Sequence, residues 1–236
     1  MWDLAECSPD RKPIGCGWVF QVKYKANGSL ECYRAHLVAK GYSQKPHLDY
    51  TETFAPVVKF AALQTIIAIA ATEDLELNSL DISSAFLNGD LEEEIYMSQL
   101  EGFAVPGKEH LVCHLKKSLY GLKQSPRQWY HKLNNMFMQL GFQCIKSDNC
   151  IHVWAKDSLQ IIIPVFVDDP TLAATGCPLM DSIKAELMCK FKMWDLGPLD
   201  YILGIQVIQD HSKCLIYLSQ VKHIDDVLAK HNMMNC

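Results

Sequence analysis

Two adjacent carboxylates, Asp168 and Asp169, follow directly after the apolar run from Ile161 to Val167. A strand with such a run buries its body, so the two charges lie at the rim of a core, where a cation usually balances them. A second segment, Leu80 to Leu87, again delivers one carboxylate, Asp81, out of apolar surroundings. If the three carboxylates converge, they form an oxygen-rich site of the kind that binds hard divalent metals such as Mg²⁺.

The composition is that of an ordinary soluble globular protein. The 236 residues are 49% hydrophobic and 21% charged, which suits one large domain or two small ones. No apolar run is long enough for a transmembrane helix, and the first seven residues do not resemble a signal peptide. The ten cysteines show no metal-ligand spacing, so we expect reduced thiols in an intracellular compartment and no zinc site.

The charges are unevenly distributed along the chain. The formal net charge of −5 argues mildly against a nucleic-acid partner, but residues 11–48 contain seven Lys or Arg against one acid, Glu31. Residues 110–147 contain six Lys or Arg and no acid, whereas acids gather at residues 90–94. Two basic zones beside a carboxylate cluster suit a bound polyanion. Taken alone, however, the pattern is more typical of solvated faces.

Hydrophobic periodicity and turn residues predict alternating strands and helices. Expected strands are 16–24, 30–41, 76–82, 94–97, 111–115, 151–154, 159–167, 201–208 and 215–218, with an Asn27-Gly28 turn joining the first two. Expected helices are 61–73, 125–140, 179–191 and 221–231. Ser125 is predicted to cap the second helix, with Pro126 at its first position. This order predicts an α+β fold, an antiparallel sheet with helices packed on one face.

The carboxylates suit nucleotidyl transfer. That reaction needs two divalent ions about 3.5–4 Å apart, one activating the attacking hydroxyl and one holding the leaving pyrophosphate. Asp81, Asp168 and Asp169 have the right chemistry for both ions. A lone Asp-Asp pair more often belongs to a turn or a helix cap, and the residues alone leave the two interpretations about even.

Several longer motifs resemble the reverse transcriptase domain of Ty1/copia-type long-terminal-repeat retrotransposons. They occur in the family's order, cover nearly all of residues 18–220, and are most specific in the block from Ser118 to Trp129. They are Tyr33-Arg-Ala-His-Leu-Val-Ala-Lys-Gly41, Asp49-Tyr-Thr-Glu-Thr-Phe-Ala-Pro-Val57, Leu80-Asp-Ile-Ser-Ser-Ala-Phe-Leu-Asn-Gly-Asp-Leu91, Glu92-Glu-Glu-Ile-Tyr-Met97, Lys117-Ser-Leu-Tyr-Gly-Leu-Lys-Gln-Ser-Pro-Arg-Gln-Trp129, Phe166-Val-Asp-Asp169, Phe191-Lys-Met-Trp-Asp-Leu-Gly197 and Ile202-Leu-Gly-Ile205.

The resemblance implies a polymerase with fingers and palm. Residues 1–15 would be an N-terminal extension, residues 16–220 fingers and palm, with fingers at about 16–75 and parts of 88–125, and residues 221–236 a truncated start of the thumb. Asp81, Asp168 and Asp169 would bind two Mg²⁺ ions, or Mn²⁺, with help from the backbone carbonyl of Ile82.

The same resemblance assigns contacts to the substrates. Arg34, Phe86, Gly121 and Lys123 would bind the deoxynucleotide, with Phe86 blocking a ribose 2′-hydroxyl. The template and primer would meet Gln124, Ser125, Pro126, Phe166, Leu203 and Gly204. The residues alone favour a core aromatic at position 86, leave a solvated lysine at position 123 equally plausible, and fit an ordinary strand at Leu203-Gly204.

The chain departs from the family at several positions. Cys32 and His36 stand where the family usually has Arg, Ser83-Ser84 replace Lys-Thr, Phe166 replaces Tyr, and Trp194 replaces Lys. Pro170 replaces Leu or Met directly after the Asp pair, where it removes a backbone N–H and restricts Asp169. We therefore expect weakened or absent polymerase activity.

Three functions remain open: a polymerase using an RNA or DNA template with a primer and deoxynucleotides, an inactive remnant that only binds nucleic acid, and a protein-interaction module. The resemblance implies a fragment of a Pol polyprotein that lacks integrase and ribonuclease H, with an incomplete thumb and poor processivity. It also implies no membrane partner and, if the gene is expressed, a cytoplasmic location in virus-like particles.

Overall fold

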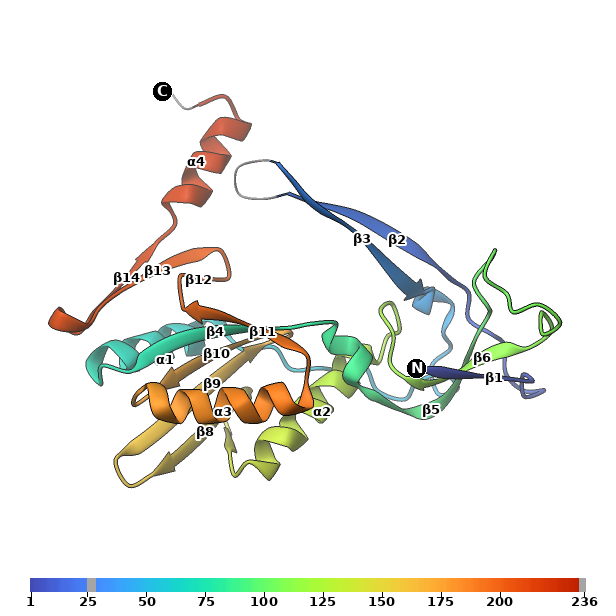
Figure 1. Cartoon of the computed structure of the whole chain (residues 1–236), viewed down its shortest axis with the longest axis horizontal. Coiled ribbons are helices and arrows are strands. Elements are labelled where there is room, and N and C mark those ends of the chain that lie inside the picture. Colours follow the sequence, from blue (N-terminus) through green and yellow to red (C-terminus); the bar gives the residue numbers. More distant parts are fainter. Residues whose placement is uncertain (25–28, 234–236) are drawn as a thin grey trace. The chain divides into compact units, whose positions relative to one another are not determined.

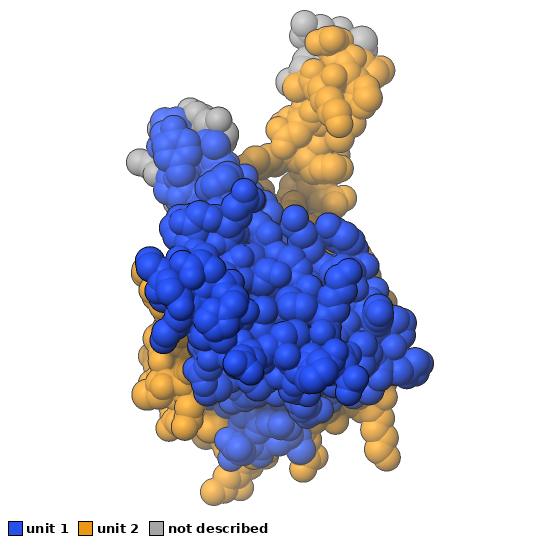
Figure 2. Space-filling view, turned by 90° about the vertical axis from the view of Figure 1, so that its right-hand side faces the viewer, with its two compact units in different colours: residues 1–56, 84–139 blue, residues 57–83, 140–236 orange. Residues whose placement is uncertain are grey.

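The computed structural model describes residues 1–24 and 29–233, in two compact units (Figure 2). Unit 1 comprises residues 1–56 and 84–139, and unit 2 comprises residues 57–83 and 140–236. The predicted Asn27-Gly28 turn lies outside the described residues. All ladders between the named strands are antiparallel, which confirms the predicted α+β class. The division into fingers, palm and thumb stays a prediction, and so does the packing of the helices on one face of the sheet.

Unit 1 contains a three-stranded sheet and a separate long hairpin (Figure 1). The sheet has the order β1 (Trp2–Ala5), β6 (Val112–Lys117), β5 (Asp90–Met97). The hairpin pairs β2 (Cys16–Tyr24) with β3 (Leu30–Ala39). The helical segments are η1 (Gly41–Ser43), η2 (Ala85–Asn88) and α2 (Ser125–Gln139).

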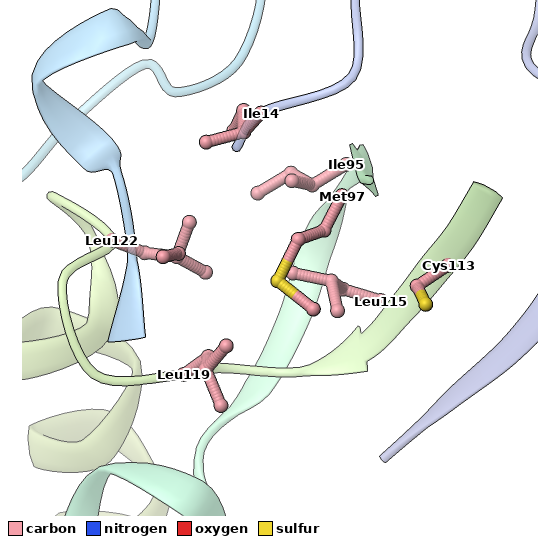
Figure 3. Packing of buried hydrophobic residues seen from close by; sticks show 8 residues of the cluster. Ile14, Ile95, Met97, Cys113, Leu115, Leu119 and Leu122 are labelled. Atoms are coloured by element: carbon pink, nitrogen blue, oxygen red, sulfur yellow. The ribbon is translucent and has the colours of Figure 1, made fainter. Parts of the chain in front are cut away.

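The core of unit 1 packs the segment after β6 against the strands. Ile95 and Met97 of β5 lie two residues apart and therefore point to one side of the sheet. Leu115 of β6 joins them, and all three are at most 2% exposed. Leu119 and Leu122, from the loop that precedes α2, complete the cluster together with Ile14, Ala39 and Cys113 (Figure 3). The loop is thereby anchored by apolar contacts at both of its leucines.

Two glycines allow this loop to approach the end of β3. The Ala39 N–H donates to the Tyr120 carbonyl at 2.8 Å. Gly121 has a φ of +92°, and a Cβ on Gly41 would lie 1.9 Å from the Gly121 carbonyl oxygen. No side chain larger than hydrogen fits at Gly41 without moving backbone.

Unit 2 is built on a six-stranded antiparallel sheet (Figure 1). The strand order is β11 (Met193–Pro198), β4 (Glu76–Ile82), β10 (Asp169–Ala174), β9 (Leu159–Phe166), β8 (Asp148–Lys156), β7 (Gln143–Ile145). Helices α1 (Phe60–Thr72) and α3 (Cys177–Lys190) both contact β10. A small sheet of β12 (Tyr201–Ile202), β13 (Ile205–Asp210) and β14 (Leu215–Ser219) follows with the short η3 (His211–Lys213), and α4 (Val221–Lys230) comes last.

The four predicted helices and the hairpin from residue 151 to 167 are confirmed, with two corrections of local structure. Ser125 is not a helix cap, because α2 already includes it and its hydroxyl donates to the Leu119 carbonyl at 2.6 Å. The strand predicted at 201–208 is broken at Leu203-Gly204, where φ angles of +50° and +79° make a tight turn. Positive φ at both central residues is the signature of a type I′ hairpin turn.

We predict that Gly41→Ala lowers the free energy of unfolding by about 1–3 kcal/mol, the usual cost of overpacking, because its methyl group would collide with the Gly121 carbonyl. Gly17→Ala is the matched control, because a Cβ there would meet only Lys40 Cε at 4.0 Å. Urea denaturation measures both variants. Equal midpoints for the two alanine variants would contradict the close approach.

Candidate active site

The register of β4 against β10 sets where the carboxylates of unit 2 lie. Thr171 is paired with Ser79, and the Ile82 N–H donates to the Asp168 carbonyl at 2.9 Å. Continuing this register places Asp169 opposite Asp81. Residues directly opposite each other in an antiparallel pair share one face of the sheet, with Cβ atoms about 4.5–5.5 Å apart. The fold therefore brings Asp81 and Asp169 to the same face, with Asp168 in the adjoining turn.

A strained two-residue turn presents the Asp pair. Phe166 and Asp169 are paired at the ends of β9 and β10, so Val167 and Asp168 form the turn between them. Val167 has a φ of +58°, which is rare for a β-branched residue and costs about 1–3 kcal/mol. The antiparallel pairing on both sides holds this conformation in place.

The pKa values of Asp168 and Asp169 are both raised, first by burial and then by neighbouring carboxylates. Partial burial and then the charges of Asp168 and Asp81 raise the pKa of Asp169 to about 6, although part of its side chain remains exposed. Burial, followed by the charge of Asp81, also raises the pKa of Asp168. Among the described residues, no three His, Cys, Asp or Glu side chains already converge as a metal-binding group. The charges of Asp81 and Asp168 act on Asp169, and the chemistry of the three carboxylates fits a hard cation.

Pro170 lies in a central strand of the sheet. It is buried, it is the second residue of β10, and its partner on β9 is Val165. The pairing of β10 with β4 begins one residue later, at Thr171, and Pro170 itself offers no N–H. Asp169 nevertheless belongs to β10 and pairs with Phe166. The effect of Pro170 on activity stays a prediction.

A hollow of about 240 Å³ lies beside Asp169 in unit 2. It is lined by Phe166 and Asp169 from the β9–β10 hairpin, by Leu196 of β11, and by Tyr201 and Leu203 from the segment that follows β11, among others. Gly204 completes the turn with Leu203. The fold thus gathers Phe166 and Leu203, two residues that the resemblance assigns to the template and primer, next to one carboxylate.

The remaining candidate residues belong to unit 1, where a buried glutamine pair organises them. Gln44 donates from Nε2 to Gln124 Oε1 at 3.0 Å, and its own Oε1 accepts the Lys123 N–H at 2.8 Å. Gln124 also donates to the Asp49 carbonyl at 2.9 Å. Gln124 is 0% exposed and Ser125 is 1% exposed. Because both side chains are bonded inside the protein, we expect them to position their neighbours rather than touch template or primer.

The nucleotide-binding candidates have distinct surroundings. Lys123 is exposed, its amine donates to the Tyr50 hydroxyl at 3.2 Å, and it lies 4.9 Å from the Tyr50 ring centroid. Phe86 is half-buried with its ring centroid 5.1 Å from that of Tyr120, so it is not a fully buried core aromatic. Arg34 is exposed on β3, Gly121 is exposed, and Pro126 is half-buried in α2.

Gln44, Asp49 and Tyr50 were missed as functional candidates by the sequence analysis. Asp49 accepts the Lys45 N–H at 2.7 Å, which helps to fix the loop that carries Tyr50. The segment from Asp49 to Val57 matches a family motif, but no local pattern marks a glutamine 80 residues before Gln124 as its partner. Only the tertiary structure shows this pairing.

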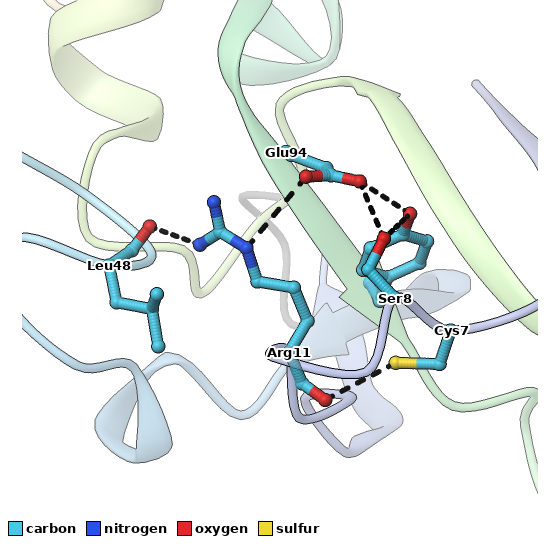
Figure 4. A network of polar contacts seen from close by, with 6 residues as sticks. Cys7, Ser8, Arg11, Leu48 and Glu94 are labelled. Carbon is cyan, nitrogen blue, oxygen red and sulfur yellow. Dashed lines mark hydrogen bonds and ion pairs between the residues drawn. The ribbon is translucent and has the colours of Figure 1, made fainter.

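Several residues of the basic zones are neutralised inside unit 1. Arg11 contacts Glu94 at 3.8 Å and donates to the Leu48 carbonyl, while Glu94 also accepts from Ser8 and Tyr96 (Figure 4). Lys132 pairs with Asp90 at 2.6 Å, and Lys116 pairs with Asp3. Two of the acids at residues 90–94 therefore partner one basic residue from each zone, Arg11 and Lys132, whereas Lys116 is paired with Asp3 of β1. Arg11, Lys116 and Lys132 are therefore less available to bind a polyanion than the sequence suggests.

Comparison with known proteins identifies consistent relatives. A family model described as reverse transcriptase (RNA-dependent DNA polymerase) matches residues 1–236. The chain is 43% identical over 235 residues to the retrovirus-related Pol polyprotein from transposon TNT 1-94 of Nicotiana tabacum, covering 99% of this chain and 18% of that protein. It is 38% identical over 234 residues to the Pol polyprotein from transposon RE1 of Arabidopsis thaliana, covering 99% of this chain and 16% of the relative.

A yeast relative is more distant. The truncated transposon Ty1-A Gag-Pol polyprotein of Saccharomyces cerevisiae is 31% identical over 240 residues, covering 98% of this chain and 19% of the relative. The chain thus spans less than a fifth of the length of these three relatives. Among the described residues, no helix is long and apolar enough to cross a membrane.

We predict that Asp169→Asn raises the melting temperature at pH 7 in the absence of divalent ions. A carboxyl whose pKa is raised on folding destabilises the folded state once it ionises, so stability is lost as the pH rises from about 4 to about 6. The gain from the substitution should therefore be largest above pH 6 and small near pH 4. Asp157→Asn, in the exposed β8–β9 turn, is the control. A gain that is the same at both pH values would contradict the raised pKa of Asp169.

Proposed function

The chain belongs to the reverse transcriptase (RNA-dependent DNA polymerase) family, and on this basis we propose that it catalyses template-directed transfer of deoxynucleotides to a primer. The primer 3′-hydroxyl would attack the α-phosphate of the incoming deoxynucleotide, and pyrophosphate would leave. RNA or DNA would serve as template, and the remaining functions of a Pol polyprotein would reside in other regions. An intracellular location follows from this role.

One observation supports the proposal: the register of β4 against β10 places Asp169 opposite Asp81, with Asp168 in the adjoining turn. These carboxylates, with the carbonyl of Ile82, would hold two Mg²⁺ ions. The ions would lower the pKa of the primer hydroxyl and neutralise the leaving pyrophosphate. Mutual repulsion between the carboxylates is the force that such cations would relieve.

The residues of unit 1 would bind the triphosphate and the base. Lys123 and Arg34 are exposed cations suited to phosphate oxygens. Phe86, fixed beside Tyr120, would restrict the space at the sugar 2′ position. The Gln44–Gln124 pair would hold the backbone of Gly121 and Lys123 in the geometry that these contacts need.

The substitutions at Cys32, His36, Trp194 and Pro170 support a second candidate, an inactive remnant that still binds nucleic acid. Two of them leave a cysteine and an imidazole where the family has guanidinium groups. Pro170 lies next to a proposed metal ligand and within a central strand, where proline is seldom found. For this chain we expect reduced but metal-dependent primer extension.

A module that only contacts other proteins is the third candidate function. The absence of salt-sensitive binding to a template–primer duplex would favour it.

We predict that Asp168→Asn abolishes primer extension while template–primer affinity changes little, because the amide loses the charge that a metal ion requires. Extension in Mg²⁺ and in Mn²⁺, together with fluorescence anisotropy of a labelled duplex, measures both properties. Asp157→Asn serves as a control that leaves extension unchanged. If Asp168→Asn extends primers as well as the unsubstituted chain does, the metal assignment is wrong. If the unsubstituted chain binds duplex but never extends it with either metal, the binding remnant is the better description.

We also predict that Pro170→Leu increases the extension rate, because leucine restores a backbone N–H to β10 and frees Asp169 from the restriction that a following proline imposes. The effect should appear in kcat more than in the KM for deoxynucleotide, since the change lies beside the carboxylates. Single-nucleotide incorporation kinetics measure both constants. An equal or slower rate would show that Pro170 does not limit activity.

A further inference from the structure

Trp194 lies beside the carboxylates, in a row that runs across three strands. It is paired with Asp81 in the ladder between β11 and β4. On the other side of Asp81, the register between β4 and β10 places Asp169 opposite it. Directly opposed residues share a face, so Trp194, Asp81 and Asp169 follow one another across the sheet.

The neighbour of Trp194 shows which face this is. Asp195 is bonded to Lys184 of α3 at 2.9 Å, and Lys184 is largely buried. Asp195 therefore points to the face that α3 covers. Because successive side chains in a strand alternate between faces, Trp194 points to the opposite face. Leu196, the extra residue of the bulge between Asp195 and Gly197, lines the same hollow as Asp169.

The indole of Trp194 is available to a ligand. Trp194 is 59% exposed, and Leu196 and Tyr201 are 58% and 48% exposed. These large apolar groups stand next to carboxylates, on a face that must meet a polyanion if the proposed function holds. A nucleic acid strand satisfies both conditions, because its bases stack on aromatic rings while its backbone is drawn to the carboxylates through cations. The chain continues from β11 to Tyr201 and Leu203, so Trp194 is on the side of the carboxylates that we assign to the primer.

We propose that Trp194 is a primer-contacting residue whose indole stacks on the terminal nucleotide of the primer strand and positions its 3′-hydroxyl at Asp81 and Asp169. This inference rests on the proposed function and adds a contact that it does not require. A lysine at this position would offer a point charge to phosphate. The tryptophan instead offers a surface to the base, so the grip on the primer end depends on stacking.

A fluorescent adenine analogue, 2-aminopurine, at the primer 3′ end tests the stacking directly. The duplex is bound in Ca²⁺, which holds the nucleic acid without turnover, at saturating protein. Stacking on an indole quenches the probe, so the complex of the unsubstituted chain should be dimmer than that of Trp194→Ala, with Trp194→Phe between them. Trp194→Ala should also weaken primer-end affinity about 5- to 150-fold, the range for loss of one base–aromatic stack.

Two controls separate stacking from a general effect on the fold. Met188→Ala removes an exposed apolar side chain from α3, which covers the other face, and should change neither brightness nor affinity. The analogue placed inside the duplex should give equal brightness in all variants. A terminal probe that is equally bright with and without the indole would overturn the inference.

The outcomes also distinguish this inference from the proposed function. A brightness difference without extension in Mg²⁺ or Mn²⁺ would support the primer contact and contradict the polymerase. Extension with no brightness difference would support the polymerase and contradict the contact. A chain that fails to bind the duplex at all would overturn both.

Discussion

The antiparallel register between β4 and β10 is the constraint on which the site depends. Thr171 opposite Ser79 and the bond from Ile82 to Asp168 leave one alignment, in which Asp81 faces Asp169. A slip of one residue would turn every side chain of β10 to the other face and separate the carboxylates. The buried Leu172 of β10 opposes such a slip, because the slip would turn its side chain away from the face against which it packs. The apolar residues of these strands thus specify where the charges lie.

Unit 1 solves a different physical problem, which is to hold a loop in one conformation. The loop from Leu119 to Gln124 has little regular structure, so its backbone needs partners from elsewhere. Leu119 and Leu122 anchor it in the core, Gly41 lets it approach β3, and Gln44 accepts its Lys123 N–H. Each of these three contacts lowers the conformational entropy of the loop before a ligand binds. Binding a ligand in one fixed geometry then costs less entropy.

The sequence predicted those features that are written locally. The Asp pair after an apolar strand, the amphipathic α1 and the stop of α2 at Gly141 each depend on neighbouring residues, and each is found. Features set by distant partners were missed. Ser125 bonds to Leu119 instead of capping its helix, and Arg11 meets Glu94, 83 residues later, instead of remaining in a basic zone. Leu203-Gly204 reads equally well as strand or turn until β12 and β13 pair across it.

The chain passes between the two units three times, after Pro56, Ser83 and Gln139. As a result, β4 obtains both of its partner strands from residues that follow Asp168. A reading frame that stops before residue 140 would still translate Asp81 but would leave β4 with two unpaired edges and an apolar face. Such an edge is a template for aggregation. Early stop codons in copies of an element with this architecture would therefore yield insoluble products rather than smaller folded units.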